Sequence, residues 1–282
     1  MTRLADVARA SARVAENPAR LAKIRELADL LKRLEAEEIE IVIPFLSGDM
    51  RQGKLSIGYG VLQAARTAGS ESATLTVRDV DSVFDQLRAT KGKGSAERRQ
   101  ALLRSLFGRA TDEEQDFLAR LIVGELRQGA VEGVMLEAVA AATGLPAAEL
   151  RRAATFAGGI PQVARAALYG GGLEQFSIRL MQPVLPMLAQ PAEDVASALA
   201  ALGSALFEWK LDGARIQVHK AGNEVRVFTR NLNDVTARGA GGGFRPAGRR
   251  CGSDSRWRSD CVARRRPPAP VPGHDAPLRP QD

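Results

Sequence analysis

Lys210 is the residue of this sequence best placed to do covalent chemistry. It stands between the apolar residues Trp209 and Leu211, and two arginines, Arg215 and Arg230, follow shortly after it. Desolvation and nearby positive charge both favour the neutral amine, which is the nucleophilic form of a lysine. An amine beside two guanidinium groups also suits a polyphosphate ligand. This group of residues predicts attack by a lysine on an activated phosphate.

The elements that must position Lys210 are strands, because apolar and polar residues alternate along this part of the chain. The pattern predicts a hairpin and a preceding strand, with strands at 207–211, 216–219 and 225–229 and a turn at 221–223. This hairpin would bring Lys210, Arg215 and Arg230 towards one pocket. The residues alone leave an alternative open, a surface strand on which Glu208, Lys210 and Asp212 form a charge ladder.

The preceding part of the chain predicts helices and no convincing strand up to about residue 176. Apolar residues recur there at three- and four-residue steps, and Thr111 with Glu114 makes a capping box. The expected helices cover 4–14, 21–34, 59–68, 79–90, 95–107, 112–127, 131–142 and 147–155. A glycine-rich and proline-rich segment between Gly170 and Pro191 predicts a linker, and a short helix is expected at 193–203.

An internal repeat lies within this helical half. Residues 46–53 recur 76 positions later as 122–129, with an apolar residue, Gly, an acidic residue, an apolar residue, Arg, Gln and Gly in the same order. Two copies predict a pseudo-twofold helical domain that presents two similar turns. Arg51 and Arg127 in these turns are candidate contacts to DNA phosphates. The alternative is that the glycines end helices and the arginines are solvated.

A second candidate phosphate loop runs from Lys91 to Ser95 with the sequence Lys-Gly-Lys-Gly-Ser. It lacks the preceding strand and the spacing of a P-loop, so a linker is the favoured interpretation.

Composition excludes several classes of protein. The 282 residues are 45% hydrophobic and 26% charged, and no apolar run approaches the roughly 18 residues of a membrane helix. The first residues do not resemble a secretory signal, so the expected compartment is the cytoplasm and no membrane partner is expected. Two cysteines and two histidines leave little room for a metal site, and the metal ligands stay unknown.

The net charge of +7 is concentrated in residues 238–282, which hold ten arginines and four aspartates, a net of +6. Basic composition therefore does not by itself argue that the preceding residues bind nucleic acid. Arg, Gly and Pro dominate this tail and large apolar residues are few, so it is expected to be disordered. We interpret it as the product of a lost reading frame near Arg238; a natural arginine-rich arm and a small folded subdomain are the alternatives.

The motif Lys210-x-Asp212-Gly213-x-Arg215, followed by residues 228–231, resembles the nucleotide-binding start of the ATP-dependent DNA ligases. The segment 183–189 resembles the entry to the ligase adenylation domain. The helical half, in which the sequence Arg-Gln-Gly occurs twice, resembles the DNA-binding domain of archaeal and actinobacterial-type ligases. The match covers about residues 1–237.

The resemblance implies a multidomain protein: an all-α DNA-binding domain at 1–176, then the start of an α+β, antiparallel-sheet nucleotidyltransferase adenylation domain at 177–237. It implies that Lys210 attacks the α-phosphate of ATP, that Glu208 binds adenine, and that Arg215 and Arg230 contact ribose and phosphate, with Mg²⁺ assisting. The substrate would be nicked duplex DNA, the chain a monomer, and the roles those of ligases in replication, repair, recombination and cell division.

Departures from the family pattern follow Thr236. The expected Asp-Gly-Glu segment, adenine-stacking aromatic, Glu-Gly motif, paired lysines and OB-fold are not recognisable in the residues that follow. We therefore expect an adenylation domain cut after its first hairpin, which would not seal DNA. The alternatives are a non-catalytic helical DNA-binding fragment and another covalent nucleotidyltransferase, such as an RNA ligase.

Overall fold

A computed structural model describes residues 1–126, 132–186, 191–206 and 215–236. The chain forms two compact units, Met1–Ile178 and Arg179–Asp282, and each is considered by itself. The strand predicted at 207–211 and the disorder predicted for 238–282 lie outside the described residues.

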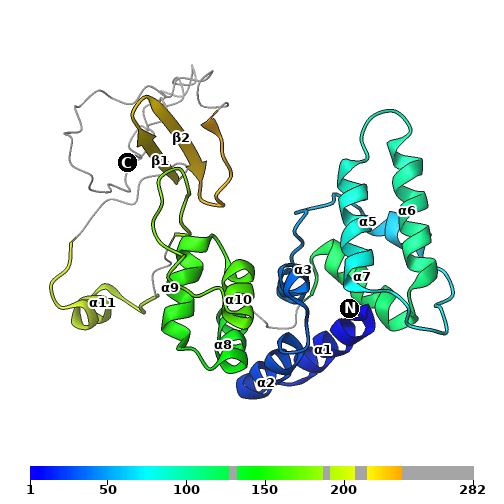
Figure 1. Cartoon of the computed structure of the whole chain (residues 1–282), viewed down its shortest axis with the longest axis horizontal. Coiled ribbons are helices and arrows are strands. Elements are labelled where there is room, and N and C mark those ends of the chain that lie inside the picture. Colours follow the sequence, from blue (N-terminus) through cyan, green and yellow to red (C-terminus); the bar gives the residue numbers. More distant parts are fainter. Residues whose placement is uncertain (127–131, 187–190, 207–214, 237–282) are drawn as a thin grey trace, which may run out of the picture. The chain divides into compact units, whose positions relative to one another are not determined.

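Helices are the main elements of the first unit, as the sequence predicts (Figure 1), and its described residues add only an isolated bridge between Arg3 and Thr76. Its helices are α1 (Leu4–Glu16), α2 (Arg20–Leu31), α3 (Ala36–Ser47), α4 (Tyr59–Ala65), α5 (Val77–Ala89), α6 (Ser95–Arg109), α7 (Asp112–Val123), α8 (Glu132–Thr143), α9 (Ala147–Ala157) and α10 (Ile160–Tyr169). In the described part of the chain no single helix has the length and apolar composition to cross a bilayer; α8 and α9 meet those criteria only when taken together across a 120° bend.

Two of these helices, α3 and α10, were not among those expected from the sequence. The second half of helix α3 is an unbroken apolar run from Ile41 to Leu46 that includes Pro44, so it lacks the alternation with polar residues that reveals an amphipathic helix. Helix α10 follows Gly158 and Gly159 and carries Pro161 at its start. That combination resembles a loop in sequence, although proline is well tolerated in the first turn of a helix.

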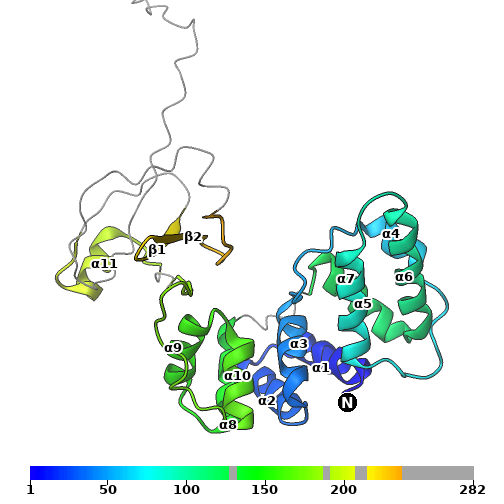
Figure 2. The same cartoon turned by 45° about the horizontal axis from the view of Figure 1, so that its top comes forward.

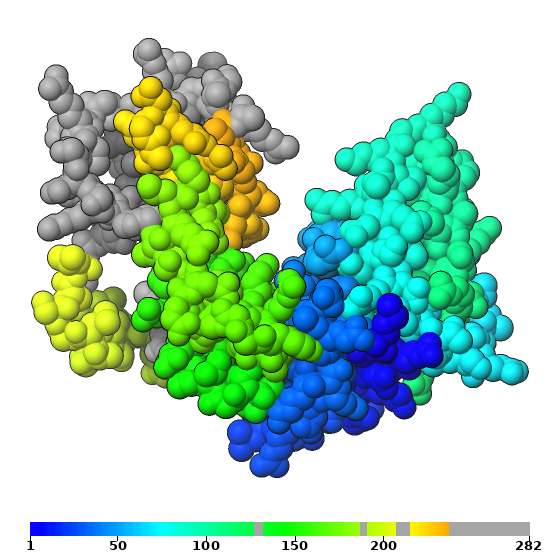
Figure 3. Space-filling model, in the orientation of Figure 1, coloured from blue at the N-terminus to red at the C-terminus, as the bar shows by residue number. Residues whose placement is uncertain are grey.

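Helices α1–α4 and α5–α8 are two copies of one arrangement. Contacts between the copies come in exchanged pairs: α1 packs on α7 as α5 packs on α3, and α2 packs on α8 as α6 packs on α4. Figure 2 shows α4 to α7 grouped beside α1 and α3, and in Figure 3 the N-terminal helices, in blue, lie between the green and cyan parts of this unit. The predicted pseudo-twofold organisation is therefore present.

Burial follows the duplication closely. The seven buried residues of α3 and the seven of α7 occupy the same positions once the numbering is shifted by 76. Both helices start with a capping box, at Glu35 and Thr111, and both end at a glycine with positive φ, Gly48 at 77° and Gly124 at 80°. Left-handed backbone at these positions favours glycine. The repeat recognised in sequence is thus one part of a longer repeated unit.

The two copies meet where their first helices begin. The amide of Leu4 donates to the carbonyl of Leu75 at 2.9 Å, and the amide of Val77 donates to the carbonyl of Thr2 at 3.1 Å. These two bonds exchange under a shift of 73 residues, so they mark the pseudo-twofold axis. They also satisfy backbone amides at the N-termini of α1 and α5, which no intrahelical carbonyl can reach.

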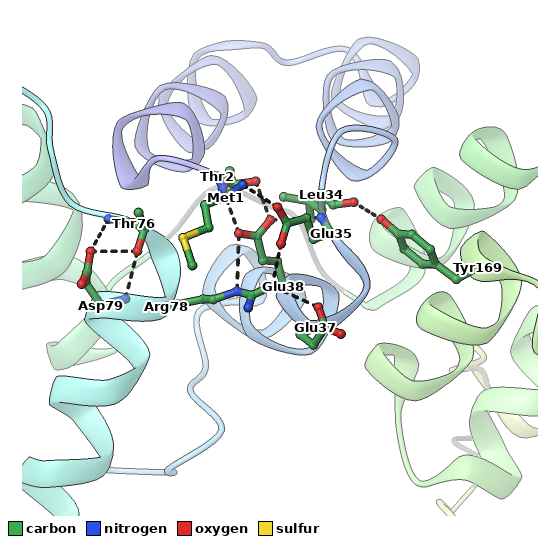
Figure 4. Close-up of polar contacts among 10 residues, drawn as sticks. All are labelled: Met1, Thr2, Leu34, Glu35, Glu37, Glu38, Thr76, Arg78, Asp79 and Tyr169. Carbon is green, nitrogen blue, oxygen red and sulfur yellow. Dashed lines mark hydrogen bonds and ion pairs between the residues drawn. The ribbon is translucent and has the colours of Figure 1, made fainter.

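Glu38 of α3 secures this junction (Figure 4). Its buried carboxylate accepts from the amide and hydroxyl of Thr2, at 2.8 and 2.7 Å, and from the amide of Glu35 at 3.0 Å. Burial would raise the pKa of Glu38, but the hydrogen bonds from Glu35 and Thr2 outweigh it and leave the pKa below its ordinary value. Arg78 of α5 donates to Glu35 and Glu37 beside it.

Replacing Glu38 by Gln should lower the free energy of unfolding by about 1–3 kcal/mol, because a side-chain NH₂ would then face donor groups. Since the pKa of Glu38 is lowered, its contribution is complete above the unfolded-state pKa and is lost as the pH falls below it. Urea unfolding from pH 3 to 7 measures both effects. The exposed Glu97→Gln variant is the control, and equal effects of the two substitutions would contradict this role.

The described residues of the second unit form α11 (Val195–Leu202) and a hairpin of β1 (Ile216–Ala221) and β2 (Glu224–Thr229). Asp194 caps α11 by accepting from the amide of Ser197 at 2.7 Å. The hairpin and its turn match the sequence prediction, and Gly222 in the turn has a φ of +57°.

Candidate functional site

The hairpin brings two of the predicted site residues to one end of the sheet. Ile216 pairs with Thr229 at the open end of the antiparallel ladder, opposite the turn (Figure 1). Arg215 precedes Ile216 and Arg230 follows Thr229, and both arginines are exposed. They therefore flank the same end of the hairpin. Lys210 and Glu208 lie outside the described residues.

Gln217 of β1 attaches the proline-rich entry segment to the hairpin. Its side-chain oxygen accepts from the amide of Val184 at 3.0 Å, and its side-chain nitrogen donates to the carbonyl of Val184 at 2.6 Å. The amide side chain thus satisfies both backbone groups of one residue, as a neighbouring strand would. Gln217 lies on a strand that the sequence predicts, but nothing in the sequence pairs it with Val184 or indicates this role.

The chain after β2 folds back onto β2. The amide of Thr229 donates to the carbonyl of Asn233 at 3.0 Å, and the amide of Val235 donates to the carbonyl of Val227 at 2.8 Å. The hydroxyl of Thr236 accepts from the amide of Val227 at 3.0 Å and donates to Asp234 at 2.5 Å. This return holds Arg230 in a tight turn. Two hydrogen bonds from Thr236 also lower the pKa of Asp234.

His219 of β1 and Phe228 of β2 pack against each other on one face of the hairpin. The two rings meet edge to face with centroids 5.1 Å apart, and both side chains are buried. Burial lowers the pKa of His219, because the charged imidazolium loses its hydration. His219 is therefore a packing residue of the hairpin, and it does not lie at the end that Arg215 and Arg230 flank.

In the helical unit, Arg51 of the first repeated turn contacts two carboxylates of α5. Its guanidinium donates to Asp81 at 2.5 Å and to Asp85 at 3.0 Å. The neighbouring Gln52 is buried and donates to the same two side chains, at 2.8 and 2.9 Å. These contacts fasten the turn to α5. Arg127 of the second turn lies outside the described residues.

Asp81 and Asp85 were missed by the sequence analysis. They stand four residues apart and therefore share one face of α5, which was a usable signal. Their positions in the first copy are taken by Ala8 and Ala12, so the two copies differ in charge at this point.

Metal binding finds no support among the described residues, where no group of three or more His, Cys, Asp or Glu side chains could hold an ion. The described part of the chain therefore assigns no ligand to Mg²⁺.

Comparison with known proteins identifies both units. The family model for the DNA ligase N terminus matches residues 56–140, and that for the ATP-dependent DNA ligase domain matches residues 186–245. Proteins named "Probable DNA ligase" from Anaeromyxobacter sp. (strain Fw109-5) and Mycolicibacterium gilvum (strain PYR-GCK) are 53% and 52% identical over 237 and 238 residues. Each alignment covers 83% of this chain and 46% of the relative.

The chain belongs to the ATP-dependent DNA ligase family. The helical unit contains the match to the ligase N terminus, and the match to the ATP-dependent ligase domain starts at residue 186, before α11 and the hairpin. The chain spans about half the length of the ligases it matches.

In this ligase-family hairpin, the buried His219 predicts a dependence of stability on pH. Because the pKa of His219 is lowered in the folded state, the unfolded chain takes up the proton first as the pH falls below the ordinary histidine pKa of about 6.5. The hairpin should therefore be fully stable above that pH and lose stability below it. Titration of the His219 ring by NMR should give a midpoint below 6.5, and His219→Phe should abolish the acid loss of hairpin stability. A midpoint at or above 6.5 would contradict the prediction.

Proposed function

We propose that this chain carries the nucleotide-accepting chemistry of an ATP-dependent DNA ligase, with Lys210 as the nucleophile. The observation that carries the proposal is the placement of Arg215 and Arg230 at one end of the hairpin, shortly after Lys210 in a chain of this family. Two exposed guanidinium groups at one end of a sheet suit the phosphates of a nucleotide.

In the proposed reaction the neutral amine of Lys210 attacks the α-phosphorus of ATP. A P–N bond forms, the bond from that phosphorus to the bridging oxygen breaks, pyrophosphate leaves, and the lysine gives up a proton. Glu208 would bind adenine, while Arg215 and Arg230 would hold ribose and phosphate and stabilise developing charge. When bound, Mg²⁺ would neutralise charge on the phosphates.

The proposed partner of the helical unit is nicked duplex DNA. In the complete reaction of the family, AMP passes to the 5′-phosphate at the nick and the 3′-hydroxyl displaces it. We propose that the chain is a cytoplasmic monomer, and that intact members of its family act in the replication, repair and recombination of DNA. The first alternative is a helical fragment that binds DNA without catalysis. The second is another covalent nucleotidyltransferase, such as an RNA ligase.

Incubation with ATP labelled at the α-phosphate, in the presence of Mg²⁺, tests the chemistry. Wild-type chain should acquire an acid-labile label, Lys210→Arg should acquire none, and Lys220→Arg on β1 should label normally. Transfer of the label to nicked DNA rather than RNA distinguishes the ligase from the second alternative. Failure of the wild type to label, with DNA binding intact, would favour the non-catalytic fragment.

Binding of duplex DNA tests the two repeated turns. Replacing both Arg51 and Arg127 by Ala should weaken binding and reduce its salt dependence. With fewer phosphate contacts, binding releases fewer counterions from the DNA. Because Arg51 is already paired with Asp81 and Asp85, Arg127→Ala should contribute more than Arg51→Ala. Fluorescence anisotropy at several salt concentrations measures both. An unchanged salt slope in the double variant would remove these arginines from the interface.

A further inference from the structure

Most ion pairs of the helical unit use arginines that face a carboxylate on a neighbouring helix, as in Arg13–Glu26 and Arg20–Glu137. A different group of cations lies where α5 and α6 are joined. We call this group the α5–α6 basic surface; it consists of Lys54, Arg88, Lys91, Lys93 and Arg99. Among the described residues none of these five forms an ion pair, and Glu97 is the single acidic residue between Asp85 and Asp112.

The described contacts bring these side chains together. A guanidinium nitrogen of Arg88 lies 3.7 Å from the place a Cβ would occupy at Gly53, and Arg99 donates to the carbonyl of Leu55. Lys54 stands between those two points of the chain and is exposed. The first repeated turn therefore runs from its anchor at Asp81 directly into the α5–α6 basic surface.

The loop that carries Lys91 and Lys93 has a defined backbone. Gly92 and Gly94 take positive φ values of 82° and 71°. The guanidinium of Arg98 donates to the carbonyls of Lys91 and Lys93 at 3.2 and 3.1 Å. These bonds engage the carbonyls and leave both lysine side chains exposed. Figure 1 shows this loop at the end of the α5–α6 pair, and in Figure 3 that end tapers to a projecting tip.

The duplication shows that the fold does not need these cations. Helices α1 and α5 bury matching positions, yet Ala15 stands where Arg88 does. The connection between α1 and α2 covers residues 17–19, whereas that between α5 and α6 covers 90–94 and contains both lysines. Glu97 is the one acidic residue in this stretch of the chain, so the cations repel one another, and a bound polyanion would relieve that repulsion.

We propose that the α5–α6 basic surface binds the phosphodiester backbone of duplex DNA, so that the helical unit engages DNA asymmetrically despite its pseudo-twofold fold. The inference rests on the proposed DNA-binding function and extends it to residues outside the repeated arginines. Duplex DNA presents a phosphate about every 1.7 Å of its axis, so several cations of the surface can be neutralised at once.

The test compares two triple variants of the full 282-residue chain. Arg88→Ala/Lys91→Ala/Lys93→Ala removes three charges from the surface. Arg25→Ala/Lys32→Ala/Arg33→Ala removes three exposed charges from the other copy. None of these three side chains forms an ion pair among the described residues. Binding of a fluorescent nicked duplex is measured without ATP from 50 to 200 mM salt. The first variant should lose at least about tenfold in affinity and reduce the salt slope by about two to three, at about 0.9 per lost phosphate contact. The second should change both much less.

Equal losses in the two variants, or no loss in the first, would overturn the proposal. Arg88→Lys/Lys91→Arg/Lys93→Arg keeps the charges and should retain the wild-type salt slope, and circular dichroism of every variant checks folding. Labelling of Lys210 by ATP needs no DNA, so its failure affects the proposed chemistry alone. If the two triple variants do not differ in DNA affinity and salt slope, only the proposal about the α5–α6 basic surface fails. In a competition experiment, unlabelled duplex RNA should displace the fluorescent duplex less well than unlabelled duplex DNA does. Equal displacement by the two competitors would overturn the assignment to DNA.

Discussion

The helical unit depends on the exchange of backbone hydrogen bonds between residues 2–4 and 75–77. Each segment leads into the first helix of one copy, and at that point each has amides that its own helix cannot satisfy. Pairing the two segments satisfies amides of both, and the buried carboxylate of Glu38 holds Thr2 of the first segment by two further hydrogen bonds. In the second copy Glu114 is also fully buried and completes the capping box of α7. The copies are therefore joined by backbone hydrogen bonds as well as by apolar contacts, and each copy has a buried glutamate in a capping box.

Equivalent cores leave the surface free to diverge. In the second copy α5 presents Asp81 and Asp85 to Arg51, where α1 has alanines at the corresponding positions. The α5–α6 connection is longer than its counterpart and carries lysines. Because exposed charges contribute little to stability, such changes are tolerated by the fold. A pseudo-symmetric scaffold can in this way support an asymmetric binding surface.

The second unit is organised by side chains that substitute for backbone partners. Gln217 pairs with both backbone groups of Val184, and Thr236 accepts from Val227 while bonding to Asp234. A two-stranded hairpin is marginal in water on its own. These contacts extend it on both sides and hold the segment around Arg215 and Arg230.

The local patterns of the sequence determined much of this protein. Apolar periodicity located most helices, period-two alternation and the Ala-Gly-Asn turn located the hairpin, and the repeated octapeptide indicated the duplication. Each of these signals depends on residues close in the chain, where geometry relates spacing to position directly. The motif around Lys210 indicated the family in the same way.

Only the tertiary structure decided which groups meet across long separations. Helix α3 is continuously apolar from Ile41 to Leu46 because it packs against α10, α5, α1 and α8, and a local pattern cannot express that. Arg51 looks like a free cation in sequence, yet α5 supplies two carboxylates from 30 and 34 residues away. Contacts of this kind depend on how the helices pack, and packing is a property of the whole unit.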